Sequence, residues 1–200
     1  MIQLDKKNIY TTDEKQPAGE QPDFYANKFI GNFEIRRIFN ESDSKEQEMY
    51  HVTFKDGAMT KIHTHESEQI LIATNSSSDS PSDIGRGFVV LIEKGSNTTE
   101  EAGYNNPQFS ISKTIFLDKV GDTVCIPPNV LHCHGSTQED GVDFSHIAIR
   151  RSTLDNKQQA KSLWEYNIED MKKVMGVMDD NKVSTILKEL HVQIRKAISD

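Results

Sequence analysis

The amino-acid sequence predicts a mostly β protein that ends in an α-helical hairpin. Three observations support this fold class. Apolar and polar residues alternate in short segments between residues 24 and 149, as they do in strands with one buried face. Two segments that begin at Gly57 and Gly121 each lead to a His-x-His pair. After Arg150, apolar residues recur at intervals of three and four, which is typical of amphipathic helices.

The chain divides into three parts by composition. Residues 1–22 are polar and contain Pro17, Gly19 and Pro22, so we expect an arm rather than a folded unit. The β domain is predicted over residues 23–150 and the helical hairpin over residues 151–200. In the β domain, the alternating segment MYHVTF predicts a half-buried strand, and we expect His51 within it to be structural or exposed rather than a ligand.

The first histidine segment reads GAMTKIHTHESEQ and ends at Gln69. His63 and His65 are two positions apart, so in a strand both side chains project from the same face. Gln69 is an even number of positions from both histidines, so in a continuous strand its side chain would project from the same face. A turn at residues 66–67 would instead bring Glu68 inward, so both remain candidates.

The second segment reads GDTVCIPPNVLHCH and repeats the pattern with His132 and His134. Neutral imidazole nitrogens on a rigid strand are suitable ligands for zinc, iron, nickel, copper and manganese. Two such pairs in a chain with seven histidines predict a metal site. Either His132 or His134 can complete it.

Both segments resemble the two cupin motifs in spacing. The first has Gln69 where most cupins have Glu; the second has Asn129 where most have Gly, and Ser136 where many have Asn. The segments HTHESEQ, PPNVLHCHG and HIAI, the last at residues 146–149, resemble a subgroup of small cupins. That subgroup includes carboxymuconolactone decarboxylase-associated cupins and manganese-dependent hydroxynitrile lyases. The resemblance covers roughly residues 20–150.

The resemblance implies a fold and a set of functional residues. The fold is the cupin double-stranded β-helix, a jelly-roll barrel. The metal ligands are His63, His65, Gln69 and His132. The residues that match proton-transfer histidines of the lyase-like members are His134 and His146. The alternative is that both only support the metal ligands.

Two polar segments interrupt the predicted strands, at residues 73–87 and 93–108. They are candidate lids over the barrel mouth, or surface decoration. The helical hairpin carries two apolar stripes separated by Asp179, Asp180 and Asn181. The first stripe is read as Trp164, Ile168, Met171, Met175 and Met178, and the second as Val183, Ile186, Leu187, Leu190, Ile194 and Ile198. The stripes cover the chain's own barrel or exchange with a partner, and we expect a homodimer.

Bulk properties restrict the partners. The net charge is −8 with a pI near 5.4, and no Lys/Arg cluster forms the footprint of a nucleic-acid-binding protein. No segment has the length of a membrane span, and the first residues lack the apolar core of a signal peptide. The two cysteines are expected to be reduced and buried. We therefore expect a cytoplasmic protein.

The donor set indicates the chemistry. Three histidines and a neutral Gln leave the full charge on a divalent transition metal ion, which we expect to be manganese or iron, with nickel, copper and zinc as alternatives. An anionic or small polar molecule would bind beside it, and a histidine would transfer a proton. The sequence thus predicts a lyase-like enzyme. The alternatives are an Fe(II) cupin dioxygenase and a non-enzymatic binding cupin that signals through its C-terminal helices.

Overall fold

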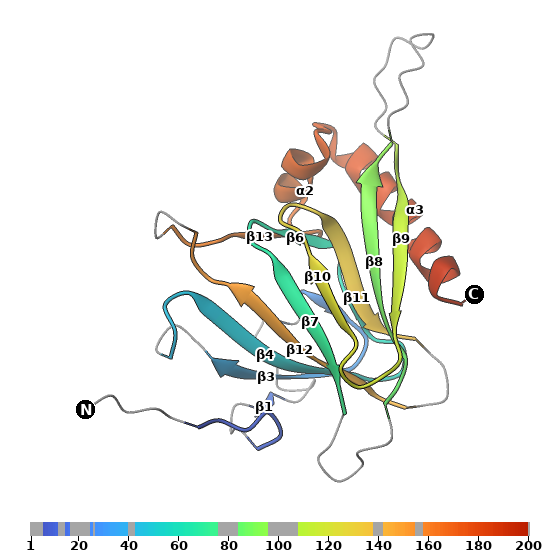
Figure 1. Ribbon diagram of the computed structural model, residues 1–200. Helices are drawn as coiled ribbons and strands as arrows, with labels where there is room; N and C mark the ends of the chain where they lie inside the picture. Colours follow the sequence, from blue (N-terminus) through green and yellow to red (C-terminus); the bar gives the residue numbers. More distant parts are fainter. Residues whose placement is uncertain are drawn as a thin grey trace.

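The structure is a computed structural model, and it describes residues 6–11, 15–16, 25, 27–39, 43–75, 84–95, 108–137, 142–154 and 158–199. The predicted arm lies largely outside these residues, and so do most of the two predicted lids. In Figure 1 two twisted sheets face each other and two helices cover the outer side of one of them.

The first sheet is six-stranded and antiparallel. Its order is β1 (Lys15–Gln16), β3 (Phe33–Phe39), β4 (Gln47–Phe54), β12 (Phe144–Arg151), β7 (Gln69–Thr74) and β10 (Thr123–Ile126). The second sheet is seven-stranded and also antiparallel. It follows the path β13 (Ser162–Trp164), β6 (His63–His65), β11 (Leu131–Ser136), β5 (Met59–Thr60) and β2 (Phe29–Ile30), and β11 also pairs with β8 (Gly87–Lys94), which pairs with β9 (Phe109–Leu117).

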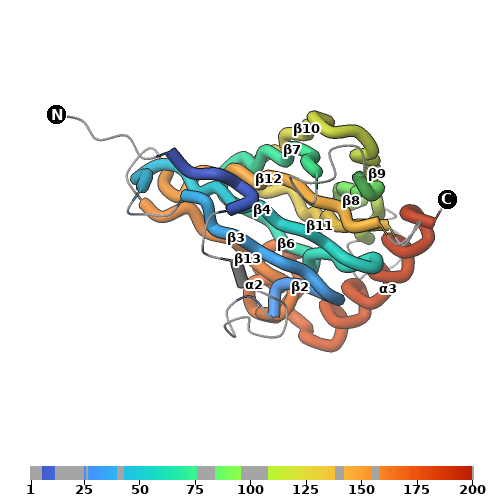
Figure 2. The backbone as a smooth tube through the Cα atoms, turned by 90° about the horizontal axis from the view of Figure 1, so that it is seen from below, coloured from blue at the N-terminus to red at the C-terminus, as the bar shows by residue number. Residues whose placement is uncertain are grey.

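The connections identify the topology. From β4 onward the chain passes from one sheet to the other at nearly every connection, so that β12 lies between β4 and β7 while β11 lies between β6 and β8. This interleaving of two antiparallel sheets is that of a jelly roll. The predicted fold class, a double-stranded β-helix with two C-terminal helices, is confirmed. Figure 2 gives the view from below, with β3, β4 and β12 on one side and the helices on the other.

Two apolar clusters fill the molecule. One lies between the sheets and includes Phe54, Leu71, Val89 and Phe144. The other lies between the second sheet and the helices, and includes Phe88, Val90 and Cys133 from the strands. Because side chains alternate along a strand, each central strand of the second sheet contributes to both layers.

The helices are α2 (Ile168–Met175) and α3 (Asp180–Ser199). Asn167 caps α2 by accepting a hydrogen bond from the Glu169 backbone N–H at 3.2 Å, and the Asp179 carboxylate accepts from the Lys182 N–H at 2.8 Å at the start of α3. In the described part of the chain, neither helix combines the length and apolar character that a bilayer span requires.

The apolar stripes of the hairpin pack on the chain's own second sheet. Met171, Met175 and Leu190 are fully buried there, whereas Met178 is 79 % exposed. The prediction was wrong for Trp164, which belongs to β13 and not to a helix. It was also wrong for Cys125, which is exposed; Cys133 is buried as expected. The homodimer stays a prediction.

Asn129 occupies the turn before β11 at a position where the related motif has glycine. Its φ is 62°, in the left-handed region, and its backbone N–H donates to the His65 carbonyl at 2.7 Å. Asn adopts this conformation more easily than other residues with a Cβ. The departure from the motif therefore preserves the turn that leads from β10 to the second histidine pair.

We predict that Asn129→Gly retains the stability of the protein, whereas Asn129→Val lowers the free energy of unfolding by about 1–3 kcal/mol, because a β-branched residue is strained at positive φ. Urea denaturation measures both. Lys119→Val, at an exposed loop position that is not among those with positive φ, serves as the control. Equal losses in the two valine variants would contradict this explanation of the turn.

Candidate metal centre and cavity

Three histidines from two neighbouring strands form a compact cluster inside the barrel. His132 of β11 is the direct partner of His63 of β6, and their ring centroids are 4.1 Å apart. His134, two residues further along β11, projects to the same side. One ring nitrogen from each of the three lies within 4.8 Å of the others, and all three side chains are buried. The strand pairing thus brings the two His-x-His pairs together.

The remaining predicted ligands lie beside this cluster. The His65 ring centroid is 4.8 Å from that of His63 and 5.4 Å from that of His132. Gln69, the first residue of β7, places its Oε1 3.1 Å from His132 Nε2. Glu68 is exposed, so Gln69 is the residue that faces the cluster. The structure therefore gathers all four predicted ligands and adds His134 to them.

Backbone carbonyls fix the tautomers of two of these histidines. His63 Nδ1 lies 2.8 Å from the Lys61 carbonyl, and His132 Nδ1 lies 2.8 Å from the Val130 carbonyl. A carbonyl oxygen can only accept, so both Nδ1 atoms carry the proton and donate it. Each Nε2 then presents a lone pair, which is the form that binds a metal ion.

Unsatisfied groups in the cluster show that a cation fits it. His132 Nε2 and Gln69 Oε1 face each other, yet in this tautomer and amide orientation both are acceptors. A cation between them, or a rotated amide, removes the conflict. His65 Nε2 and His134 Nδ1 are buried without a hydrogen-bond partner among the described residues. Imidazole nitrogens and an amide oxygen are suitable donors for a divalent transition metal ion.

Burial keeps the cluster neutral. It lowers the pKa of His132 to about 4. Burial is also the first cause that holds the pKa of His63, His65 and His134 well below the ordinary value, and neighbouring imidazoles lower it further. Neutral imidazole is the state that coordinates metal, so the cluster is ready for an ion at physiological pH.

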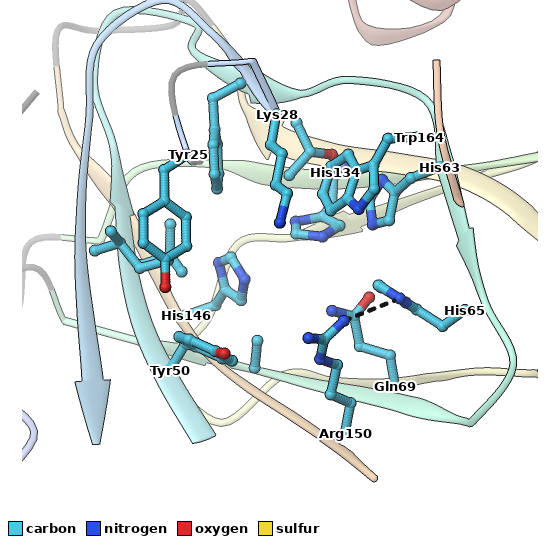
Figure 3. A pocket seen from close by; sticks show the side chains of 15 residues that line it. Tyr25, Lys28, Tyr50, His63, His65, Gln69, His134, His146, Arg150 and Trp164 are labelled. Atoms are coloured by element: carbon cyan, nitrogen blue, oxygen red, sulfur yellow. Dashed lines mark hydrogen bonds between the residues drawn. The ribbon is translucent and has the colours of Figure 1, made fainter. Parts of the chain in front are cut away.

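The cluster opens into a cavity of about 70 Å³ (Figure 3). Opposite His63 and His65, His146 of β12 projects into this space between the rings of Phe54 and Phe144, at centroid distances of 5.5 and 5.8 Å. Both His146 ring nitrogens are buried without a hydrogen-bond partner among the described residues. Burial lowers its pKa to about 3. A buried polar group without a hydrogen bond is rare in folded proteins and calls for a structural or functional explanation.

Arg150 forms one wall of the cavity. It donates from Nε to Glu48 Oε2 at 2.8 Å, its Nη2 lies 2.6 Å from the same oxygen, and its Nη1 donates to Ser162 Oγ. Ser162 Oγ in turn lies 2.7 Å from His65 Nδ1. Arg150 Nη1 is 3.3 Å from the same Nδ1, the contact that is dashed in Figure 3. The buried Glu48 thereby orients His65 through Arg150 and Ser162.

Trp164 forms another part of the wall. In the pairing of β13 with β6 it lies opposite His63, and the two rings stack at a centroid distance of 4.1 Å with an interplanar angle of 9°. The Lys28 side chain extends into the cavity, and its Nζ lies 5.3 Å from the centre of the indole ring. The indole therefore holds the His63 ring in place and borders a cationic side chain.

The sequence prediction missed Lys28, Arg150, Ser162 and Trp164 as parts of the site. Arg150 could have been found, because it shares the parity of His146 and Ala148 on the last barrel strand. Lys28, Ser162 and Trp164 are distant in sequence from both motifs and reach the cavity only through the pairings of β2 and β13. His51, expected to be structural or exposed, is buried away from the cluster, with its Nε2 3.1 Å from Thr74 Oγ1.

No protein-family model and no curated protein matches the chain. Among solved structures it is similar to a cupin-like protein from Thermotoga maritima, at 26 % identity over 76 % of this chain and 92 % of that one, with a TM-score of 0.45. A cupin-2 domain protein from Rhodospirillum rubrum is 12 % identical over 95 % and 97 % of the chains, with a TM-score of 0.46. The DMSP lyase DddQ from Ruegeria pomeroyi is 15 % identical over 73 % and 56 %, with a TM-score of 0.42.

We predict that stability falls in acid because of the buried imidazoles. Their pKa is lowered in the folded state, so the folded protein binds fewer protons than the unfolded chain, whose histidines titrate near about 6.5. The stability that each neutral imidazole contributes is therefore complete above the pKa of the unfolded chain. It is lost as the pH falls towards the folded-state pKa, about 4 for His132 and about 3 for His146. For each imidazole that stays neutral in the folded state, the free energy of unfolding falls by roughly 2 kcal/mol between about pH 6.5 and pH 5.

Urea denaturation at both pH values measures this loss. In His146→Phe, which retains an aromatic ring between Phe54 and Phe144, the loss should be smaller by about that 2 kcal/mol. Phe144→Leu perturbs the same packing without removing a titrating group, so it should show the wild-type loss. An unchanged loss in His146→Phe would refute the role of His146.

Proposed function

We propose that this chain, a cupin by its two histidine motifs and its jelly-roll topology, is a metal-dependent enzyme with lyase-like chemistry on a small anionic molecule. One observation carries the proposal. One cavity joins a neutral histidine cluster, two cationic side chains and the imidazole of His146, which has no hydrogen-bond partner among the described residues. Perturbed titratable groups that converge on a cavity are characteristic of catalytic sites.

The proposed ligands of the metal ion are His63, His65, Gln69 and His132, with His134 beside them. Manganese and iron are the ions that we expect. These side chains are all neutral, so they offset none of the charge of a divalent ion. Such an ion would polarise an oxygen of the bound molecule and stabilise negative charge that develops on it.

His146 and His134 are the proposed proton-transfer residues. Their rings meet edge to face at a centroid distance of 5.0 Å inside the cavity. Since His146 is neutral and neither of its nitrogens has a partner among the described residues, one nitrogen can accept a proton from the bound molecule. Its low pKa favours return of that proton. Burial raises the pKa of Tyr50 on the adjacent wall, so this hydroxyl stays protonated and can donate a hydrogen bond.

One contact favours the alternative of a binding protein that signals through its helices. Glu165 Oε2 accepts a hydrogen bond from the Ile62 backbone N–H at 3.2 Å and lies 2.8 Å from His191 Nε2 of α3. Ile62 precedes the metal-site strand β6. The contacts of Glu165 with Ile62 and His191 would therefore transmit a structural change at His63 to α3. An Fe(II) dioxygenase uses a similar donor set, and no separate contact favours it.

Metal binding tests the proposal. We predict that metal-depleted protein reloaded with manganese or iron retains close to one ion per chain, as measured by elemental analysis after desalting. Gln69→Ala and His132→Ala should lower the affinity by at least about tenfold, since each removes a donor. His51→Gln changes a buried histidine outside the cluster and should bind like the wild type. If no candidate ion is retained by the wild type, the enzyme proposal fails and the binding-protein alternative gains.

A further inference from the structure

The Ser162 hydroxyl determines which nitrogen of His65 carries the proton. The two residues are direct partners in the pairing of β13 with β6, and Ser162 Oγ lies 2.7 Å from His65 Nδ1. The same oxygen accepts a hydrogen bond from Arg150 Nη1. Among the described residues, His65 Nδ1 is the only hydrogen-bond acceptor that this hydroxyl contacts. Ser162 therefore donates to Nδ1, which presents its lone pair.

Arg150 favours the same arrangement. Its Nη1 lies 3.3 Å from His65 Nδ1, and Glu48 Oε2 holds the guanidinium group there by accepting from Nε at 2.8 Å (Figure 3). A guanidinium group can only donate, so an N–H on Nδ1 would face another donor. An imidazolium ring is disfavoured for the same reason, because both of its nitrogens carry protons. His65 is therefore neutral, with its proton on Nε2.

This tautomer is opposite to that of two neighbouring ligands. His63 and His132 donate from Nδ1 to backbone carbonyls and present lone pairs on Nε2. His65 also lines the cavity, and its Nε2 is buried without a hydrogen-bond partner among the described residues. A ring nitrogen that carries a hydrogen atom cannot coordinate a metal ion. It offers instead a hydrogen bond to an oxygen of a molecule in the cavity.

We infer that Ser162 and Arg150 make His65 a conditional metal ligand, which coordinates only after its tautomer has changed. The inference rests on the proposed function and states how the metal site of that enzyme is completed. The other three proposed ligands bind the ion first, since none of them needs this change. Ser162 and Arg150 are thus positioning residues that act through His65.

The two positioning residues oppose the change of tautomer. The ring loses the proton on Nε2 and gains one on Nδ1, so its charge stays the same. Ser162 Oγ must then accept from both Nδ1 and Arg150, and its own hydrogen loses its acceptor. The new N–H also faces the guanidinium group. A buried donor without an acceptor is costly, so removal of both positioning residues should strengthen metal binding through His65.

Nitrogen NMR of the histidine side chains tests the tautomer in metal-depleted protein near neutral pH. A ring nitrogen with a lone pair and one with a hydrogen atom have well-separated chemical shifts. His65→Phe identifies the His65 signals by their loss. The expected result is a proton on Nε2 of His65 and on Nδ1 of His63 and His132, which serve as internal controls. A proton on Nδ1 of His65 would overturn the inference.

A double-mutant cycle on manganese affinity tests the control by the positioning residues. Ser162→Ala combined with Arg150→Met removes both donors, while Glu48 keeps its hydrogen bond from Arg37 Nη2 at 3.1 Å. Removal of a positive charge by itself strengthens metal binding with or without His65. The gain in affinity should therefore be at least about tenfold larger in the wild-type background than in the His65→Phe background.

The outcomes separate this inference from the proposed function. If the gain is equal in the two backgrounds, charge is its cause and the conditional ligand is wrong, while the metal-dependent enzyme stands. If only the double variant retains an ion, the enzyme proposal fails for the wild type and the conditional ligand stands. If neither protein retains an ion, both fail. Thermal unfolding identifies a double variant that does not fold, in which case Ser162→Ala alone replaces it, with a smaller expected gain.

Discussion

The alternation of side chains along β11 is the constraint on which the molecule depends. His132 and His134 face the interior of the barrel, while Leu131 and Cys133 face the helices, and every residue of the strand is buried. The strand pairs with β6, β8 and β5 at once. Gly135 permits the last contact, since a Cβ there would meet the Ala58 carbonyl at 2.4 Å. A shift of one residue would exchange the two histidines for the apolar side chains.

The buried imidazoles must therefore be stabilised by their surroundings. Backbone carbonyls hold His63 and His132, and the Ser162 hydroxyl holds His65. Among the described residues His146 has no hydrogen-bond partner, and ring contacts with Phe54, Phe144 and His134 hold it. Neutral imidazole is tolerated inside a protein far better than imidazolium, which explains why the structure can collect so many histidines and why acid should unfold it.

The sequence predicts the parts of this design that follow from local periodicity. Parity places His63 with His65 and His132 with His134, and the spacing of the two motifs identifies the barrel. The alternation of residues within one strand does not identify which distant strands pair at the edges of the barrel. Trp164 reads as the start of an apolar helical stripe, and only its pairing opposite His63 reveals it as a strand residue. Lys28 carries no motif and becomes part of the site because β2 pairs with β5.

The stacking of Trp164 on His63 has a consequence for observation of the protein. The chain contains one tryptophan, and it is 8 % exposed and forms the wall of the cavity. Fluorescence excited selectively in the indole therefore originates from a single point, in van der Waals contact with a proposed metal ligand. Occupation of the cavity, by an ion or by an organic molecule, alters the environment of that one ring. The unlabelled protein thus contains an optical reporter of its own site.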